Sequence, residues 1–224
     1  YVVARVACGA EFSVAILGIE SEQELDAETE SIVWAWGQGN HGALGNGYSS
    51  DESRPIEVDA LRGLRIREAC CGSHHVVCNT TDGRFFSWGL GSSGQLCRGC
   101  VWPSDSRAQK EASMPAQIDI PSLMPEGWKV MSGANSVHGW LVSCAANSTM
   151  IACQFHENHN SILVLGEGDG HKGTLRDWDF KVLAEPVAAV ACGRGFEIIV
   201  TVMPERVSLV NLAKSVAADS MLSI

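Results

Sequence analysis

The feature that most restricts the fold of this 224-residue chain is an internal repeat of about 60 residues. Four segments share a small residue followed by glycine: VACGAEFSVAI, EACCGSHHVVC, KVMSGANSVHGWLV and AVACGRGFEIIV. Their glycines are Gly9, Gly72, Gly133 and Gly193, at spacings of 63, 61 and 60 residues. A fixed period of this length is typical of proteins that stack copies of one structural unit, and the sequence predicts such an arrangement.

Two further signals follow each of the first three glycines in the same order. A Trp-Gly string with more glycines reads VWAWGQGNHGALGNG and FFSWGLGSSGQLCRG, and a degraded third copy reads LVLGEGDGHKGTL. A proline before an extended string then recurs at Pro55, Pro115 and Pro186. The predicted structural positions of the repeat are Gly9, Gly37, Gly72, Gly89, Gly133, Gly166, Gly193, Trp36 and Trp88.

Each unit has the composition of β-structure. In the second unit, the Asp-Gly of NTTDG (79–83) favours a tight hairpin turn, and the aromatic string from Phe85 favours the next strand. Glycine clusters end that strand, and the proline string begins another. About four short strands per unit is the pattern of a propeller blade, which needs a neighbour on each side to bury both faces of its sheet.

These patterns predict an all-β array of three to four propeller blades over residues 1–204. Its units span about 1–60, 61–120 and 121–186, and a fourth begins at 187–204. Residues 205–224 are predicted to form a C-terminal cap. Leu209, Leu212 and Val216 have helical spacing, whereas Arg206 to Val210 also reads as a strand. We favour a strand followed by a short helix from about Leu212.

The strings WAWGQGNHGALGNG, FSWGLGSSGQLCRG and ACCGSHHVVCNTTDGRFFSWG resemble the repeat of the regulator of chromosome condensation family. The resemblance covers about residues 1–202 and is weaker in the third unit, where Leu165 replaces the motif Trp and Ser132 the Cys. It implies a seven-bladed propeller, of which this chain holds about half. The missing blades would come from the same longer protein or from another chain.

The resemblance implies a non-enzymatic protein-interaction scaffold. It leaves two alternatives open: a guanine-nucleotide exchange factor for a small GTPase, and the substrate-recruiting propeller of a large ubiquitin ligase. Neither scaffold nor exchange factor carries out covalent catalysis, and no residue of this chain is predicted to be catalytic. Binding in propellers normally resides in loops that vary on a rigid frame.

Composition narrows the classes of partner. A net charge of −10 argues against a surface that neutralises nucleic-acid phosphates, and no charge-free apolar stretch is long enough to cross a membrane. Nine cysteines, an odd number found mostly in apolar strings, favour a reducing, intracellular compartment. The composition does not distinguish nucleus, cytoplasm and cilium.

An acidic insertion is the one segment whose composition suggests a partner contact. ESEQELDAETE (20–30) lengthens the first unit and contains six acids and no base. One interpretation is a solvated loop, and the other is a contact for a basic partner. The candidate contact residues are Glu20, Glu22, Glu24, Asp26, Glu28 and Glu30.

Several motifs match part of a ligand-binding signature but lack the flanking elements that such a site requires. Two G-x-G-x-x-G strings, 37–42 and 89–94, lack the following helix of a dinucleotide site. Cys97-x-x-Cys100 has no second pair at zinc-ribbon spacing, and Cys153-x-x-His156-x-x-His159 would need two insertions to meet. We therefore predict no metal site and no cofactor.

Overall fold

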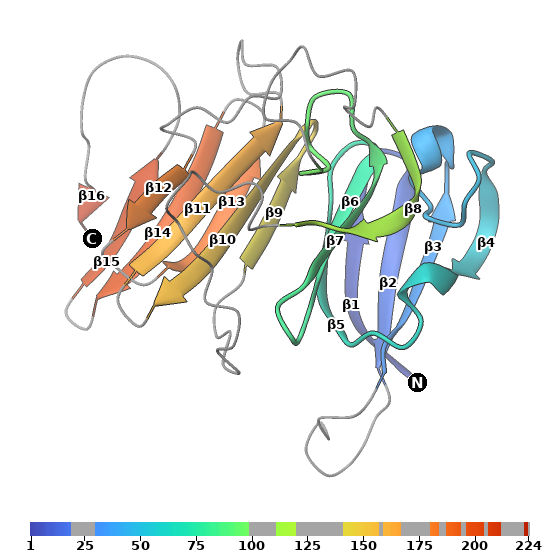
Figure 1. Cartoon of the computed structure of the whole chain (residues 1–224), viewed down its shortest axis with the longest axis horizontal. Coiled ribbons are helices and arrows are strands. Elements are labelled where there is room, and N and C mark those ends of the chain that lie inside the picture. Colours follow the sequence, from blue (N-terminus) through green and yellow to red (C-terminus); the bar gives the residue numbers. More distant parts are fainter. Residues whose placement is uncertain are drawn as a thin grey trace.

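The structure of this protein, a computed structural model, describes residues 1–18, 30–98, 111–119, 141–156, 159–166, 180–183, 187–193, 196–203, 206–211 and 222–223. These residues form four antiparallel sheets of four strands each, arranged side by side like the blades of a fan (Figure 1). In every sheet the strands lie in chain order, so each sheet is a simple up-and-down meander. The all-β, partial-propeller prediction is confirmed.

The first sheet holds β1 (Val2–Cys8), β2 (Phe12–Gly18), β3 (Ile32–Gly37) and β4 (Glu52–Glu57). The second holds β5 (Ile66–Cys71), β6 (His75–Thr80), β7 (Phe85–Leu90) and β8 (Glu111–Gln117). The third holds β9 (Leu141–Ala145), β10 (Ser148–His156), β11 (His159–Gly166) and β12 (Phe180–Leu183). The fourth holds β13 (Val187–Gly193), β14 (Phe196–Met203), β15 (Arg206–Asn211) and β16 (Leu222–Ser223). Two single 3₁₀ turns, η1 (Asn40–Gly42) and η2 (Asp59–Leu61), flank β4.

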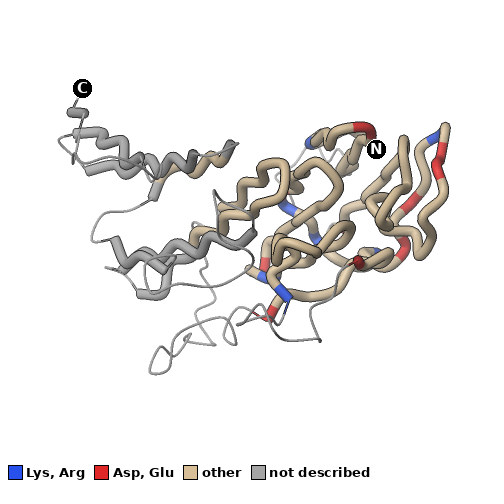
Figure 2. The backbone as a smooth tube through the Cα atoms, turned by 90° about the horizontal axis from the view of Figure 1, so that it is seen from above, with Lys and Arg blue, Asp and Glu red and all other residues tan. Residues whose placement is uncertain are grey.

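The first strands of successive sheets, β1, β5, β9 and β13, are neighbours in that order and form the inner edge of the fan. The middle strands β2, β3, β6 and β7 contain no Lys, Arg, Asp or Glu, so the charged residues of the first two sheets lie on the other strands and in loops. Figure 2 shows these charged residues scattered along the described backbone. The largest core cluster fills the space between the first two sheets, around Phe12, Leu44, Phe86 and Trp88. Face-to-face burial therefore holds neighbouring sheets together.

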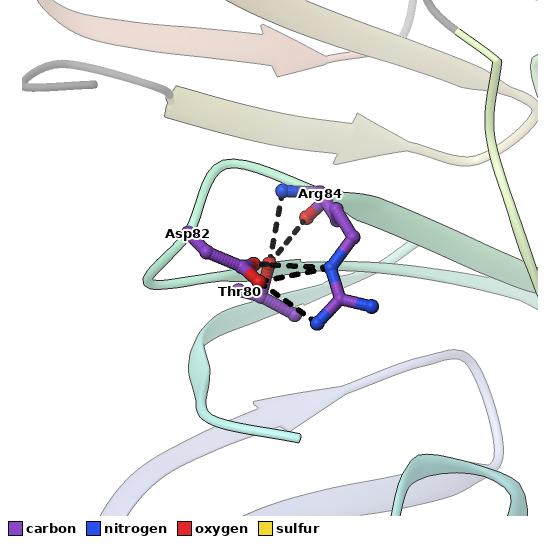
Figure 3. A network of polar contacts seen from close by, with 3 residues as sticks. All are labelled: Thr80, Asp82 and Arg84. Atoms are coloured by element: carbon purple, nitrogen blue, oxygen red, sulfur yellow. Dashed lines mark hydrogen bonds and ion pairs between the residues drawn. The ribbon is translucent and has the colours of Figure 1, made fainter. Parts of the chain in front are cut away.

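The β6–β7 hairpin forms at the Asp-Gly pair, as predicted. Gly83 has a positive φ of 84°, which glycine adopts without a steric penalty. Thr80 and Asp82 share a side-chain hydrogen bond, and the Arg84 guanidinium pairs with Asp82 at 2.8 Å (Figure 3). The backbone N–H of Arg84 donates to the Thr80 hydroxyl at 2.9 Å, so the turn is fixed by side chains as well as by its backbone.

The C-terminal part differs from the sequence prediction in one respect. The string after Pro186 was aligned with the outer strands that contain Pro55 and Pro115, but Val187–Gly193 is the inner strand β13 of the fourth sheet. The outer strand of the third sheet is β12. Arg206–Asn211 is a strand, in agreement with the interpretation we favoured, and the helix predicted from Leu212 lies outside the described residues.

Among the residues that the structure describes, no helix has the length and apolar character needed to span a membrane.

Candidate interaction surface

The strand registers define the repeat more sharply than the sequence strings. One cysteine in each inner strand pairs with the residue five positions later: Cys8 with Ser13, Cys71 with Val76, Cys144 with Thr149 and Cys192 with Glu197. We call these four the repeat cysteines. The residue after each one is Gly9, Gly72, Ala145 or Gly193. In the third sheet, Ala145 therefore occupies the position predicted at Gly133, and Gly133 lies outside the described residues.

The alanine is explained by the residue three positions later. A Cβ added to Gly9 would lie 2.0 Å from the Phe12 ring, and one added to Gly72 would lie 2.1 Å from the His75 ring. In the third sheet the corresponding residue is Ser148, which has no ring. Glycine is therefore required only where an aromatic or imidazole ring covers this position.

The glycines that end the third strands have a different role. Gly37 and Gly89 occupy equivalent positions, opposite Phe12 and His75, with φ of 109° and 100°. A Cβ on Gly89 would lie 2.3 Å from the carbonyl oxygen of His74. Both the positive φ and the close backbone approach exclude other residues here. Gly166 lies opposite Ser148 and Leu165 opposite Thr149, so the third copy retains the register although it has lost the Trp.

Trp88 joins the second sheet to the first. Its side chain is fully buried, and its Nε1–H donates to the carbonyl oxygen of Ala43 at 2.9 Å. Ala43 belongs to the glycine-rich turn that follows β3, and the indole also approaches Gly45 closely. The Gly47 N–H donates to the Ser113 carbonyl of β8 at 2.8 Å. The glycine-rich turn of the first sheet therefore packs against the Trp of the second sheet.

The second and third sheets are joined by buried polar contacts. Thr149 donates its hydroxyl to the Gln95 carbonyl at 2.7 Å, so His75 Nε2–H must be the donor in its 2.9 Å contact with Thr149 Oγ1. Burial lowers the pKa of His75 to about 3, and this imidazole is neutral at pH 7. Along the inner edge, Ala10 N–H donates to the Ser73 carbonyl and Ser73 N–H to the Ala146 carbonyl.

One side of the first sheet has no neighbour among the described residues. The register places Val6, Ala15 and Trp34 in one row, and Cys8, Ser13 and Trp36 in the next, on the side opposite the second sheet. We call these six residues the open face. Val6 is 69% exposed and Trp34 38% exposed, although both are large and apolar. Exposed apolar side chains grouped in this way make the open face a candidate contact surface.

Loops contribute a smaller polar cluster between the first two sheets. His41, in the glycine-rich turn, contacts Glu111 of β8 at 2.8 Å through Nδ1, and its ring meets that of His74 edge-on at 5.4 Å. Both His41 and Glu111 are exposed. Of the acidic insertion, only Glu30 is described, and it is exposed. The other five candidate contact residues, Glu20, Glu22, Glu24, Asp26 and Glu28, lie outside the described residues.

Among the side chains that the structure describes, the motifs considered above form no metal site, and those of Cys153, His156 and His159 lie outside this description. Within the described residues no group of three or more His, Cys, Asp or Glu side chains is arranged to hold a metal ion. Cys97 is buried and Cys100 lies outside the description. The first G-x-G-x-x-G string leads into the single turn η1 and then β4, not into a helix that could bind a phosphate at its N-terminus.

Four meander sheets arranged radially, with a repeated glycine-rich turn between them, define part of a β-propeller. A family model described as the regulator of chromosome condensation (RCC1) repeat matches residues 31–78. Residues 31–78 thus contain the repeat of this family, as the motifs predicted.

The relatives of this chain are longer proteins. Ultraviolet-B receptor UVR8 of Arabidopsis thaliana is 30% identical over 138 residues, which are 62% of this chain and 29% of UVR8. Human E3 ubiquitin-protein ligase HERC2 is 37% identical over 99 residues, 43% of this chain and 2% of HERC2. Mouse RCC1 domain-containing protein 1 is 34% identical over 109 residues, 49% of this chain and 29% of that protein. The chain thus spans less than a third of each of these relatives.

Two solved propellers show the same fold at low identity. Human WBSCR16 superposes with a TM-score of 0.59 at 17% identity, over 92% of this chain and 47% of that chain. Yeast RCC1 (Prp20), solved bound to Kap60, gives a TM-score of 0.57 at 16% identity, over 94% of this chain and 44% of that chain. The described sheets therefore correspond to a little under half of such a propeller.

Proposed function

We propose that this chain is a non-enzymatic protein-interaction scaffold whose open face binds a further sheet of the same repeat type. The observation that carries the proposal is the pair Trp36 and Trp88. Both lie at the same position of their sheets, next to Gly37 and Gly89. Trp88 is buried against the preceding sheet, whereas Trp36 is on the open face with no preceding sheet among the described residues.

The contact of Trp88 specifies the chemistry that Trp36 needs. Trp88 is satisfied by a backbone carbonyl in a glycine-rich turn, and glycines at that turn let the indole approach the backbone. A sheet that presents such a turn to Trp36 would reproduce the same junction and cover Val6 and Trp34. The superpositions support this occupant, because the solved propellers have about twice the extent of this chain.

A scaffold is favoured over a single enzymatic activity because the relatives carry different names: a light receptor, a ubiquitin ligase and, in Danio rerio, the kinase Nek8. Each of them resembles this chain over only part of its length, and a fold hosts function at sites that vary. Exchange-factor activity toward a small GTPase and substrate recruitment for a ligase are finer versions of the same binding role. No described residue favours one of them.

The occupant of the open face is tested by a charge substitution. Val6→Glu places a carboxylate among apolar side chains and should abolish association with the co-expressed remaining repeats or with a second copy of the chain. Met114→Glu is the matched control, because Met114 is 55% exposed on β8, away from the open face. Equal association of both variants in light scattering, or a wild-type monomer that binds no hydrophobic dye, would refute the proposal.

The finer activity is tested separately. Release of labelled GDP from a panel of small GTPases should be accelerated by an exchange factor and unchanged by a scaffold that only binds. Capture of a partner without any change in the rate of GDP release supports the scaffold. Accelerated GDP release would instead identify an exchange factor and refute a purely binding role.

A further inference from the structure

The repeat cysteines lie at the inner edge of the fan, where Cys71, Cys144 and Cys192 face the first strand of the preceding sheet. The backbone N–H of Cys192 donates to the hydroxyl oxygen of Ser143 at 3.0 Å. At the equivalent place one sheet earlier, the backbone N–H of Cys144 donates to the Cys70 sulfur at 3.1 Å. Ser143 and Cys70 both precede a repeat cysteine, so they perform the same structural task at successive junctions.

A serine is sufficient for that task, and Cys70 brings in addition a second thiol. The Cys144 Sγ–H donates to the Cys70 carbonyl oxygen at 3.5 Å, while the Cys144 backbone N–H donates to the Cys70 sulfur. Each sulfur is therefore in contact with the other residue. Cys70 and Cys144 are free thiols, 74 positions apart in sequence and carried by adjacent sheets.

The two thiols have unequal reactivity. The hydrogen bond from Cys144 lowers the pKa of Cys70. Burial raises the pKa of Cys144, and it also raises the pKa of Cys71, the residue that follows Cys70 in the second sheet. The thiolate is the nucleophile in thiol chemistry, and it forms more readily at Cys70. Both residues are half-buried, in contrast to the fully buried Cys78 and Cys97.

We propose that Cys70 and Cys144 are an oxidation site that forms a disulfide between the second and third sheets when the chain meets a peroxide. The Cys70 thiolate attacks one oxygen of the peroxide, the O–O bond breaks, and Cys70 becomes a sulfenic acid while water leaves after protonation. The Cys144 sulfur then attacks the sulfenic sulfur, the S–O bond breaks, and a second water leaves with the Cys144 proton. Two thiols are oxidised, and one hydrogen peroxide is reduced to two waters.

The disulfide would link two sheets that otherwise meet through polar contacts and packing alone. Since cross-linking distant positions restricts the unfolded chain, the linked form should unfold at a higher temperature than the reduced one. A thiol reductant reverses the bond, so the junction between these two sheets becomes sensitive to oxidant. The junction between the third and fourth sheets is not sensitive to oxidant, because Ser143 stands there in the position of Cys70 and has no thiol.

Peptide mapping tests this site on the full chain. The protein is treated with hydrogen peroxide, remaining thiols are alkylated, and a digest without reductant is sequenced by mass spectrometry. We expect one linked peptide pair, about 2 Da lighter than the sum of its parts, with fragments that assign the bond to Cys70 and Cys144. A disulfide from Cys70 to Cys71 would overturn the proposal. Alkylated Cys70, which has escaped the peroxide while other thiols are oxidised, would overturn it as well.

Two variants make the result specific. Cys70→Ser retains an acceptor for the Cys144 N–H, as Ser143 does for Cys192, and should remove the linked peptide while the chain still folds. Cys8→Ser, at the exposed repeat cysteine of the first sheet, should leave it in place. The oxidised wild type should melt higher than its reduced form, and Cys70→Ser should show no such difference. Equal melting of both wild-type forms would refute the linking role.

Discussion

Replacement of Trp88 by phenylalanine tests the junction on which the proposed scaffold rests. The substitution preserves an aromatic ring but removes the Nε1–H that donates to the Ala43 carbonyl at 2.9 Å. Since Trp88 is 0% exposed, water cannot replace the lost donor. Removal of the donor leaves the carbonyl unsatisfied in a buried site, which costs about 1–3 kcal/mol.

We therefore expect Trp88→Phe to lower the free energy of unfolding by about 2–4 kcal/mol, including the small cavity left by the missing ring atoms. Trp36→Phe is the internal control. It changes the same residue at the same position of the first sheet, but Trp36 lies on the open face and should lose under about 1 kcal/mol.

The measurement is urea unfolding of the 224-residue chain, followed by far-ultraviolet circular dichroism. If the reasoning holds, the transition midpoint shifts strongly for Trp88→Phe and little for Trp36→Phe. Equal shifts of the two variants would show that the Trp position acts within its own sheet and that the contact with the preceding turn contributes nothing. Addition of a partner that covers the open face should then make Trp36→Phe costly.

Three further substitutions follow from the geometry, each measured by urea unfolding. Gly9→Ala should destabilise the wild type by about 1–3 kcal/mol through overpacking against Phe12, and by less in a Phe12→Ser background; equal losses in both would refute the ring-clash account. Gly89 has φ of 100°, and a Cβ added there would lie 2.3 Å from backbone, whereas Gly63 has φ of 80° and room for a Cβ. Gly89→Ala should therefore be more destabilising than Gly63→Ala. Similar losses would show that φ alone, and not the backbone clash, determines the cost. Because burial lowers the pKa of His75 to about 3, below its ordinary 6.5, the unfolded state binds the proton first, and stability is lost as the pH falls from 6.5 to 3. His75→Phe, which copies the first sheet, should reduce that loss, and an unchanged pH profile would contradict the assignment.

The sequence was sufficient to predict the all-β fold and its four-stranded sheets. Gly37 and Gly89 are fixed by their positive φ and Trp88 by its buried contact, which is why their motifs stand out in the sequence. The alignment at Gly133 differed from the structure because glycine is needed there only beneath a ring. With Ser148 in place of a ring, Ala145 is tolerated, and the glycine signal disappears from the third unit.

The repeat cysteines illustrate the opposite case. Cys144 was visible in the sequence, but its string SCAA lacks the glycine that marks the other copies. Only the register, in which each repeat cysteine pairs with the residue five positions later, shows that the four are equivalent. The contact between Cys70 and Cys144 depends on how two sheets are placed relative to one another, and no single-strand pattern carries that information.

Each junction of this fan uses a different chemistry on the same backbone frame. The first depends on an indole donating to a turn carbonyl, the second on His75, Thr149 and a thiol pair, and the third on Ser143 accepting from Cys192. In a radial array each sheet contacts only its neighbours, so stability is approximately a sum of sheet and junction terms. A partner that supplies one missing junction therefore stabilises the whole array without altering the others. For the proposed scaffold, we therefore expect recognition at the open face of the first sheet, which lies at one end of the fan, and in the loops.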